Sequence, residues 1–403
     1  MKLFYILLAL ILASLNLRPP ITSISPLMST IQSNLGISGI TSSLLTTLPV
    51  LCMGIFAPFS VKLSRRWGNE CAIVLALILI GTGTALRLFV GATPLMMFTS
   101  FLSGVGIALA GPLLSSFIKQ YFPKRVAAMV GLYSTAMVVG ASFSVGLSVP
   151  LQNILGGSWR GSLALWALLA VIALPIWMKL ALSARKIRQS GQVSAVNVEA
   201  LPVKNSQAWV LTLFFGLMAA IFYSLTAWLA PAIQSQGYTK ETAGSIQTLF
   251  TLISLPSTLF IPMLVHRYQR RVFWLVGCAS MELIGVLMLN LSVSPWLAVI
   301  PLGIGAGGLF PIALMLPIDE TNNAQEASAW SAMTQSGGYI LGALGPLAIG
   351  WLHDTTGSFV QAFYGLAIII VLQIMVQLAI GNKKALQRFI INQSPEFDEK
   401  RLI

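Results

Sequence analysis

The sequence predicts an all-α membrane protein of twelve transmembrane helices, arranged as two pseudo-symmetric six-helix bundles. The 403 residues are 56% hydrophobic and only 9% charged, whereas soluble chains carry about 25% charged residues. Twelve apolar segments reach the length of about 20 residues that a helix needs to cross a bilayer. Several residue patterns of the first six segments recur in the last six. Together these observations favour an integral membrane protein built from two related halves.

Each expected span is a long apolar run, and most are separated by polar or Gly/Pro-containing turns. The start of the chain could mimic a signal peptide, but its apolar run continues through Arg18, so we expect a retained first span. The third–fourth and ninth–tenth pairs are the least clearly divided, since only residues 91–94 and 292–295 separate them. In chain order the spans are 3–30, 37–61, 71–90, 94–117, 127–150, 161–182, 208–233, 241–265, 272–292, 295–317, 327–352 and 359–381.

The first span carries an arginine in the middle of its apolar run. Arg18 would cost about 2.5–3.5 kcal/mol at the bilayer centre, so we expect it to face a polar cavity. Pro19 and Pro20 remove two backbone donors and free the carbonyls one turn earlier. A structural arginine that pairs with a helix end or a distant carboxylate is the alternative. On a continuous helix, i+3/i+4 spacing gives one polar stripe: Ser14, Arg18, Thr22, Ser25 and Ser29.

Lysines and arginines predict the orientation. Those outside the spans concentrate at the N-terminus, in every second loop and at the C-terminus, and only Arg18, Arg87, Arg160 and Lys240 fall elsewhere. The positive-inside rule therefore predicts that both termini are cytoplasmic. The loop between the tenth and eleventh spans is acidic instead, and we interpret it as a solvated turn rather than a gate latch. We expect four parts: a bundle over 1–182, a cytoplasmic linker over 183–206, a second bundle over 207–382 and a tail over 383–403.

The two halves share glycine and proline positions. Gly104 and Pro112 in the fourth span have the same spacing as Gly303 and Pro311 in the tenth. Parallel six-span repeats of this kind surround a central site in the major facilitator fold. The glycines allow close helix packing, and they also allow the fourth and tenth spans to flex.

Polar and aromatic side chains within the spans predict a central binding cavity. One cation, neutral hydrogen-bonding groups and aromatic walls suit a small anion or a polar planar molecule. The aromatic members could equally serve helix packing. Glu282, deep in the ninth span, either carries a proton or is a structural charge. The candidate substrate-binding residues are Arg18, Asn16, Thr22, Tyr133, Met137, Tyr223, Thr226, Gln247, Gln335 and Tyr339.

The sequence argues against several other classes. It has no H-E-x-x-H, G-x-S-x-G or P-loop motif, so we expect no enzyme. The three cysteines have unrelated spacing, and we expect no disulfide framework, metal or cofactor. The net charge of +13 lies in short loops, which is a topology signal rather than a nucleic-acid surface. The expected partners are the lipid bilayer and a small solute, and we expect a monomer.

The first span also carries a specific motif. Residues 15–19, Leu-Asn-Leu-Arg-Pro, with Thr22-Ser23 and Pro26, resemble the first span of the cyanate/2-nitroimidazole transporter branch of the major facilitator superfamily. The resemblance covers essentially the whole chain. It implies a proton- or gradient-driven inner-membrane carrier, with Arg18 as the best site candidate. The chain departs from the wider superfamily where Arg65 replaces the usual aspartate of the second–third loop, and where Ser100 stands in place of an upstream arginine.

We therefore expect a secondary active transporter of the bacterial inner membrane. It would move a small, anionic or nitro-bearing solute, cyanate- or nitroimidazole-like, by alternating access around Arg18. A multidrug efflux carrier for amphiphilic compounds is the alternative, because the aromatic and methionine walls could set a broad selectivity. A membrane sensor without solute flux is the third possibility.

Overall fold

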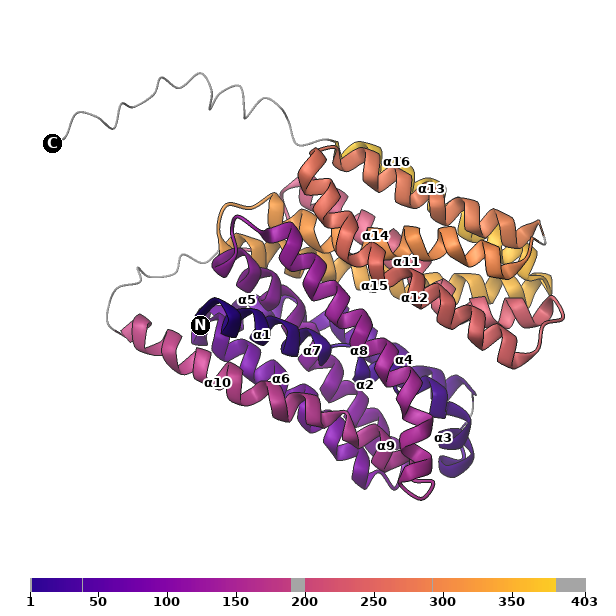
Figure 1. Ribbon diagram of the computed structural model, residues 1–403, viewed down its shortest axis with the longest axis horizontal. Coiled ribbons are helices and arrows are strands. Elements are labelled where there is room, and N and C mark those ends of the chain that lie inside the picture. Colours follow the sequence, from indigo (N-terminus) through magenta and orange to yellow (C-terminus); the bar gives the residue numbers. More distant parts are fainter. Residues whose placement is uncertain (1, 38, 190–199, 292, 382–403) are drawn as a thin grey trace.

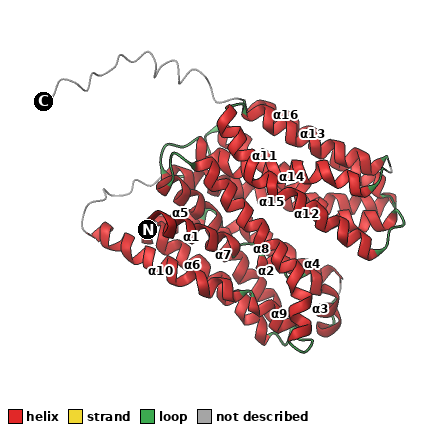
Figure 2. Cartoon of the chain, in the orientation of Figure 1, coloured by secondary structure: helices red, strands yellow, loops and turns green. Residues whose placement is uncertain are grey.

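The computed structural model describes residues 2–37, 39–189, 200–291 and 293–381. Helices joined by short loops make up these ranges (Figure 2). The first half contains α1 (Lys2–Leu15), α2 (Pro19–Thr22), η1 (Ser25–Leu27), α3 (Met28–Leu35), α4 (Gly39–Phe56), α5 (Phe59–Trp67), α6 (Asn69–Ala85), η2 (Leu86–Phe89), α7 (Thr93–Tyr121), α8 (Val126–Ile154), α9 (Trp159–Leu165) and α10 (Ala167–Gln189). The second half contains α11 (Ser206–Ser235), α12 (Lys240–Tyr268), α13 (Arg271–Asn290), α14 (Pro295–Asp319), α15 (Ala324–Thr356) and α16 (Phe359–Ile380).

The helices form two bundles that follow the two halves of the sequence (Figure 1). In the described residues, 10 helices are long and apolar enough to cross a membrane, or up to 11 if a pair bent by 60° counts as one span. The bent pair, Thr47–Phe56 with Phe59–Trp67, corresponds to the expected second span. The eleventh expected span lies within α15, which has 33 residues and is not among these 10 helices. The expected all-α membrane architecture is confirmed.

The first span is interrupted rather than continuous. α1 ends at Leu15, and Arg18 is the N-cap residue of the short helix α2, which begins with the two prolines. The predicted single stripe of polar residues is therefore wrong. Ser14 is fully buried and bonds within its own helix to Leu10 O at 2.6 Å, while Ser25 is exposed. The prolines cause this difference, because they remove the donors that would have continued α1.

The expected linker over 183–206 is helical at its start. Helix α10 continues to Gln189, so the predicted linker over 183–206 begins as helix, and α11 starts at Ser206. The middle of that linker, residues 190–199, and the predicted tail over 383–403 lie outside the described residues. We call the end of the molecule at which α10 ends and α11 begins the linker side.

The ribbons of the two bundles lie close together in their linker-side halves, and their opposite ends diverge (Figure 1). Lys119 Nζ at the end of α7 donates to Ile318 O of α14 at 3.0 Å, and the Ser336 hydroxyl of α15 donates to Gly54 O of α4 at 2.5 Å. We call this set of contacts the linker-side seam. Both of these hydrogen bonds join the two bundles in their linker-side halves.

The seam also contains close helix contacts at glycines. A Cβ added to Gly54 would lie 2.7 Å from Ile340 Cγ1, and one on Gly111 would overlap the Gln335 side chain. Helices α8 and α12 meet where the hydroxyls of Thr135 and Thr258 are 3.1 Å apart. Small residues therefore let the helices of the two bundles approach closely.

Candidate functional site

Arg18 lies at the boundary between the bundles, since it belongs to the first half of the chain and its guanidinium faces rings of α11 and α14. Its backbone occupies the interruption of the first span, and its side chain is partly exposed. The ion pair found among the described residues joins Arg271 to Glu320, so Arg18 has no acidic partner there. The alternative of a structural arginine that pairs with a carboxylate therefore gains no support from these residues. Arg18 instead presents a positive charge that a bound anion could neutralise.

Aromatic rings from the second bundle surround the Arg18 guanidinium. Its Cζ atom lies 5.7 Å from the ring centroid of Phe222 on α11 and 5.2 Å from that of Phe310 on α14. Both distances are within the range of cation–π attraction, which is worth about 0.5–2 kcal/mol. The two rings are nearly parallel, with an interplanar angle of 24°. A cation of the first bundle is thus held against aromatic faces of the second.

Three tyrosines complete the surroundings of Arg18. Tyr223 of α11, Tyr339 of α15 and Tyr133 of α8 all lie close enough to interact electrostatically with the guanidinium. The buried hydroxyl of Tyr223 lies beside Arg18 but outside hydrogen-bonding geometry, and it has no other partner among the described residues. The Tyr223 and Tyr339 ring centroids are 6.4 Å apart. A ligand at Arg18 could therefore accept a further hydrogen bond from a phenol.

The short helix α2 behind Arg18 is fixed to the first bundle. The hydroxyls of Thr22 and Ser144 of α8 are 2.6 Å apart, and the Thr22 hydroxyl also donates to Arg18 O at 3.0 Å. Gly140 of α8 has no side chain to keep it from the Leu15 carbonyl, which would be 2.7 Å from an added Cβ. The Asn16 amide donates to Leu12 O at 2.7 Å. Asn16 and Thr22 thus shape the backbone around Arg18.

The remaining candidates differ in their burial and in their hydrogen bonds. Met137 is buried on α8. Thr226 is exposed and bonds to Phe222 O, one turn earlier on α11. Gln247 on α12 has a buried amide oxygen with no partner among the described residues. Gln335 packs against Gly111 in the linker-side seam. The structure brings Arg18, Tyr133, Tyr223 and Tyr339 together.

Glu282 lies inside the second bundle, away from Arg18. It is 1% exposed, and its carboxylate accepts a hydrogen bond from Gln373 Nε2 of α16 at 3.3 Å. Its Cγ would be 2.7 Å from a Cβ on Gly305 of α14, so the carboxyl group lies where three helices meet. The adjacent titratable group on its own helix is Cys278, one turn away, which is also buried. The contacts of Glu282 are thus with helices α14 and α16.

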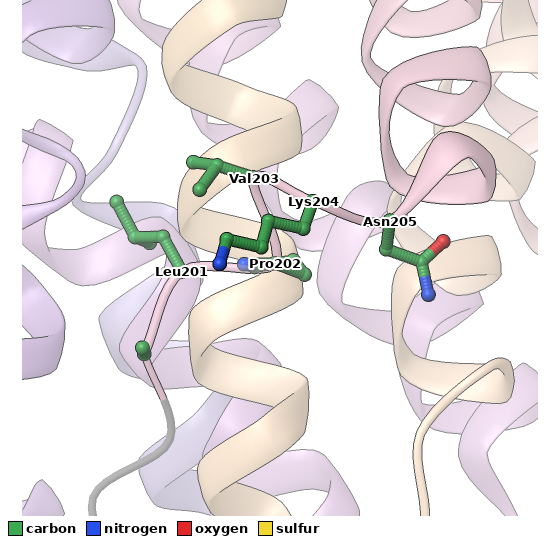
Figure 3. A pocket seen from close by; sticks show the side chains of 6 residues that line it. Leu201, Pro202, Val203, Lys204 and Asn205 are labelled. Carbon is green, nitrogen blue, oxygen red and sulfur yellow. The ribbon is translucent and has the colours of Figure 1, made fainter.

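A separate open pocket runs along Ala200–Asn205, at the end of the linker (Figure 3). One continuous segment lines it. The Asn205 side chain serves as the cap of α11, accepting from the backbone N–H groups of Gln207 and Ala208. This pocket therefore lacks the convergent polar groups of a binding site.

The sequence reasoning missed Phe222 and Phe310. Phe222 precedes Tyr223, and Phe310 precedes Pro311 in the glycine-rich tenth span, so both were adjacent to residues already singled out. Their shared position beside Arg18 depends on how two bundles dock. That arrangement leaves no local signal in the sequence.

A family model for the Major Facilitator Superfamily matches residues 6–346. The chain is 30% identical to the 2-nitroimidazole transporter of Escherichia coli (strain K12), with 94% of this chain and 95% of that protein covered. It is also 30% identical to the cyanate transport protein CynX of the same strain, with coverages of 90% and 94%. The solved proton:xylose symporter XylE shares the fold, with a TM-score of 0.73, 15% identity and coverages of 93% and 95%. The resemblance noted from the first-span motif is confirmed.

Proposed function

The chain belongs to the major facilitator superfamily of membrane transporters, and from this premise we propose that it moves a small anionic or nitro-bearing solute by alternating access. The family and the relatives are transporters and not enzymes. The printed names of two relatives, a cyanate transport protein and a 2-nitroimidazole transporter, support this solute class. Cyanate is a small anion, and a nitro group offers oxygen acceptors to a guanidinium.

The observation that carries the proposal is the environment of Arg18. It is a partly exposed cation without an acidic partner among the described residues, at the boundary of two bundles that move relative to each other in this family. An anion bound there would gain charge-assisted hydrogen bonds and remove an uncompensated charge. The adjacent unpartnered hydroxyl of Tyr223 supplies one more donor.

The linker-side seam supports the alternating-access part of the proposal. Contacts such as Lys119 to Ile318 O close the bundles on one side of Arg18, while the opposite ends diverge (Figure 1). A solute would reach Arg18 from the divergent side in this state. Opening the seam and closing the other ends would then release it across the membrane.

Proteoliposome counterflow tests the proposal, with radiolabelled cyanate and 2-nitroimidazole as probes. We expect uptake by the wild type and loss of uptake in Arg18→Ala. Arg18→Lys keeps the charge but loses the planar fork, so its apparent affinity should fall about 10- to 150-fold, which corresponds to about 1.5–3 kcal/mol. Arg66→Ala, which removes an exposed arginine of the same bundle, is the matched control. Wild-type uptake that survives intact in Arg18→Ala would contradict the assignment of the site.

The aromatic walls favour a second candidate function, efflux of larger amphiphilic compounds. Phe222, Phe310, Tyr223 and Tyr339 together offer a broad aromatic surface near the boundary. A resistance screen on expressing cells, with a panel of amphiphilic toxic compounds, separates the two functions. Broad resistance without counterflow of either small probe would favour efflux.

We also propose that the protein is a monomer in the bacterial inner membrane, with both termini cytoplasmic. The distribution of lysine and arginine supports this orientation. Membrane-impermeant thiol labelling of single cysteines at Lys124 and Gly157, in a variant that lacks the native cysteines, tests it. Lys124 should react only in inverted vesicles and Gly157 only in intact cells.

A further inference from the structure

The inference concerns a second buried arginine, Arg87, which the sequence had placed at the outer end of the third span. It lies in the 3-10 turn η2 that follows α6, and it is fully buried, with 0% exposure. Its Nη2 atom donates to the Pro20 carbonyl at 2.6 Å. Its Nε and Nη1 atoms are buried without partners, and its charge has no acid beside it among the described residues. A side chain this costly to bury calls for a specific role.

The hydrogen bond to Pro20 lies where the first span is interrupted. The helix α2 is only 4 residues long, and the chain turns again at Ser23 and Ile24 before η1 begins. No backbone N–H in the described residues outside α2 donates to the Pro20 carbonyl. Arg87 therefore supplies the hydrogen bond that a continuous helix would have supplied from residue 24. Such a bond from a charged donor is stronger than one between neutral groups.

The same short helix carries Arg18 at its N-cap, two residues before Pro20. On its other side, Thr22 bonds to Ser144 of α8, with the two hydroxyls 2.6 Å apart. The interrupted segment is thus held from η2 by Arg87 and from α8 by Ser144. Arg18 belongs to this segment, so the two hydrogen bonds fix the backbone position from which its side chain extends. A misplacement of a binding group by about 1 Å is enough to lower activity strongly.

We infer that Arg87 is a positioning residue for Arg18: its hydrogen bond to Pro20 O holds the interrupted first span in the shape that aims the Arg18 guanidinium at the solute. The inference rests on the proposed function for its effect on solute affinity. The effect of Arg87 on the backbone of the first span does not depend on the proposed function. Arg87 is fully buried, so its action on a solute would pass through the backbone of the first span.

The test compares Arg87→Met and Arg87→Lys with the wild type, in purified full-length protein. Arg160→Met is the matched control, because Arg160 also donates to a backbone carbonyl of the first bundle, that of Val90, and to Asn34 Oδ1 at 2.9 Å. Hydrogen exchange measured by mass spectrometry reports the segment 14–24 without any solute. We expect about 10-fold or faster exchange at 21–24 in Arg87→Met, partial recovery in Arg87→Lys, and wild-type exchange there in Arg160→Met.

Counterflow of cyanate and 2-nitroimidazole supplies the second readout. Arg87→Met should raise the KM for both probes by about 10-fold or more with a smaller change in maximal rate, and Arg87→Lys should recover part of it. Unchanged exchange at 21–24 in Arg87→Met overturns the inference, whatever the solute. Faster exchange with an unchanged KM also overturns it, since Arg18 would then not depend on the bond. If the wild type transports neither probe, the proposed function fails, and the exchange data alone decide whether Arg87 holds the segment.

Discussion

Gly54→Ala should open the linker-side seam. In the closed arrangement the new Cβ would lie 2.7 Å from Ile340 Cγ1, 3.2 Å from Ile340 N and 3.3 Å from Ser336 O. Two of these three atoms belong to the backbone of α15, so a side-chain rotation alone does not relieve the overlap. Overpacking of this kind costs about 1–3 kcal/mol. The cost applies only while the seam is closed, so the population of closed molecules should fall about 5- to 150-fold relative to open ones.

Distances between spin labels on the two bundles measure this shift. Labels at Lys124 and Gln325, both exposed and on the linker side, report seam opening in a variant whose Cys52, Cys71 and Cys278 have been replaced. We expect a longer distance population in Gly54→Ala. The control is Gly277→Ala on α13, where an added Cβ meets nothing within 4 Å. Identical distance distributions in the two variants would refute the reasoning.

Two further predictions concern the second bundle. Arg271→Ala removes the ion pair to Glu320 and the bonds to the end of α16, so the free energy of unfolding should fall by about 1.5–3 kcal/mol, whereas the exposed Arg267→Ala should change it by less than about 0.5 kcal/mol in the same denaturation assay. Glu282→Gln keeps the shape of the side chain and removes a buried ionisable group, so its Tm should equal or exceed that of the wild type, whereas Glu282→Leu leaves the Gln373 amide without a partner and should cost about 1–3 kcal/mol. A lower Tm for Glu282→Gln than for the wild type would contradict this prediction and show that the carboxylate charge itself is structural.

The fold could be predicted from the sequence because membrane helices are recognisable by their apolar composition. A run of about 20 apolar residues has few alternatives in a bilayer, so the span order and the two related halves followed directly. Arg18 was identifiable for the same reason, since an arginine within such a run is costly. Whether the first span is one continuous helix was harder to predict. The prolines signalled an irregular backbone, but the loss of a single polar stripe depended on how sharply the chain turns at residues 16–18.

The neighbours of Arg18 were only partly predictable. Tyr133, Tyr223 and Tyr339 were candidates because aromatic hydroxyls are conspicuous in apolar spans. Phe222 and Phe310 carry no such signal, since a phenylalanine in a membrane helix faces lipid as readily as it faces a cation. Arg87 could be mistaken for a residue of the outer loop, because its depth depends on where α6 ends. These contacts are set by the docking and rotation of helices, which the sequence pattern does not specify.

At the linker-side end of each bundle, a charged side chain at the start of one span binds the end of the next span. The charged residue is acidic in the first bundle and basic in the second. At the start of α6, Glu70 accepts from the hydroxyl of Tyr121 at the end of α7, at 2.8 Å; at the start of α13, Arg271 donates to Glu320 after α14, at 2.5 Å. The Glu70–Tyr121 pair lies within the first bundle and the Arg271–Glu320 pair within the second, and each pair joins two consecutive spans. They therefore stay intact when the bundles separate.

The seam between the bundles is built differently. Ser336 donates to a backbone carbonyl there, and Thr135 meets Thr258 through hydroxyls. A neutral hydrogen bond contributes about 0.5–1.5 kcal/mol, whereas a hydrogen bond to a charged group contributes about 1.5–3 kcal/mol. Apart from the Lys119 ammonium, which donates to Ile318 O, the seam contacts named here are neutral, and they suit the proposed alternating access, in which the two halves part in each cycle.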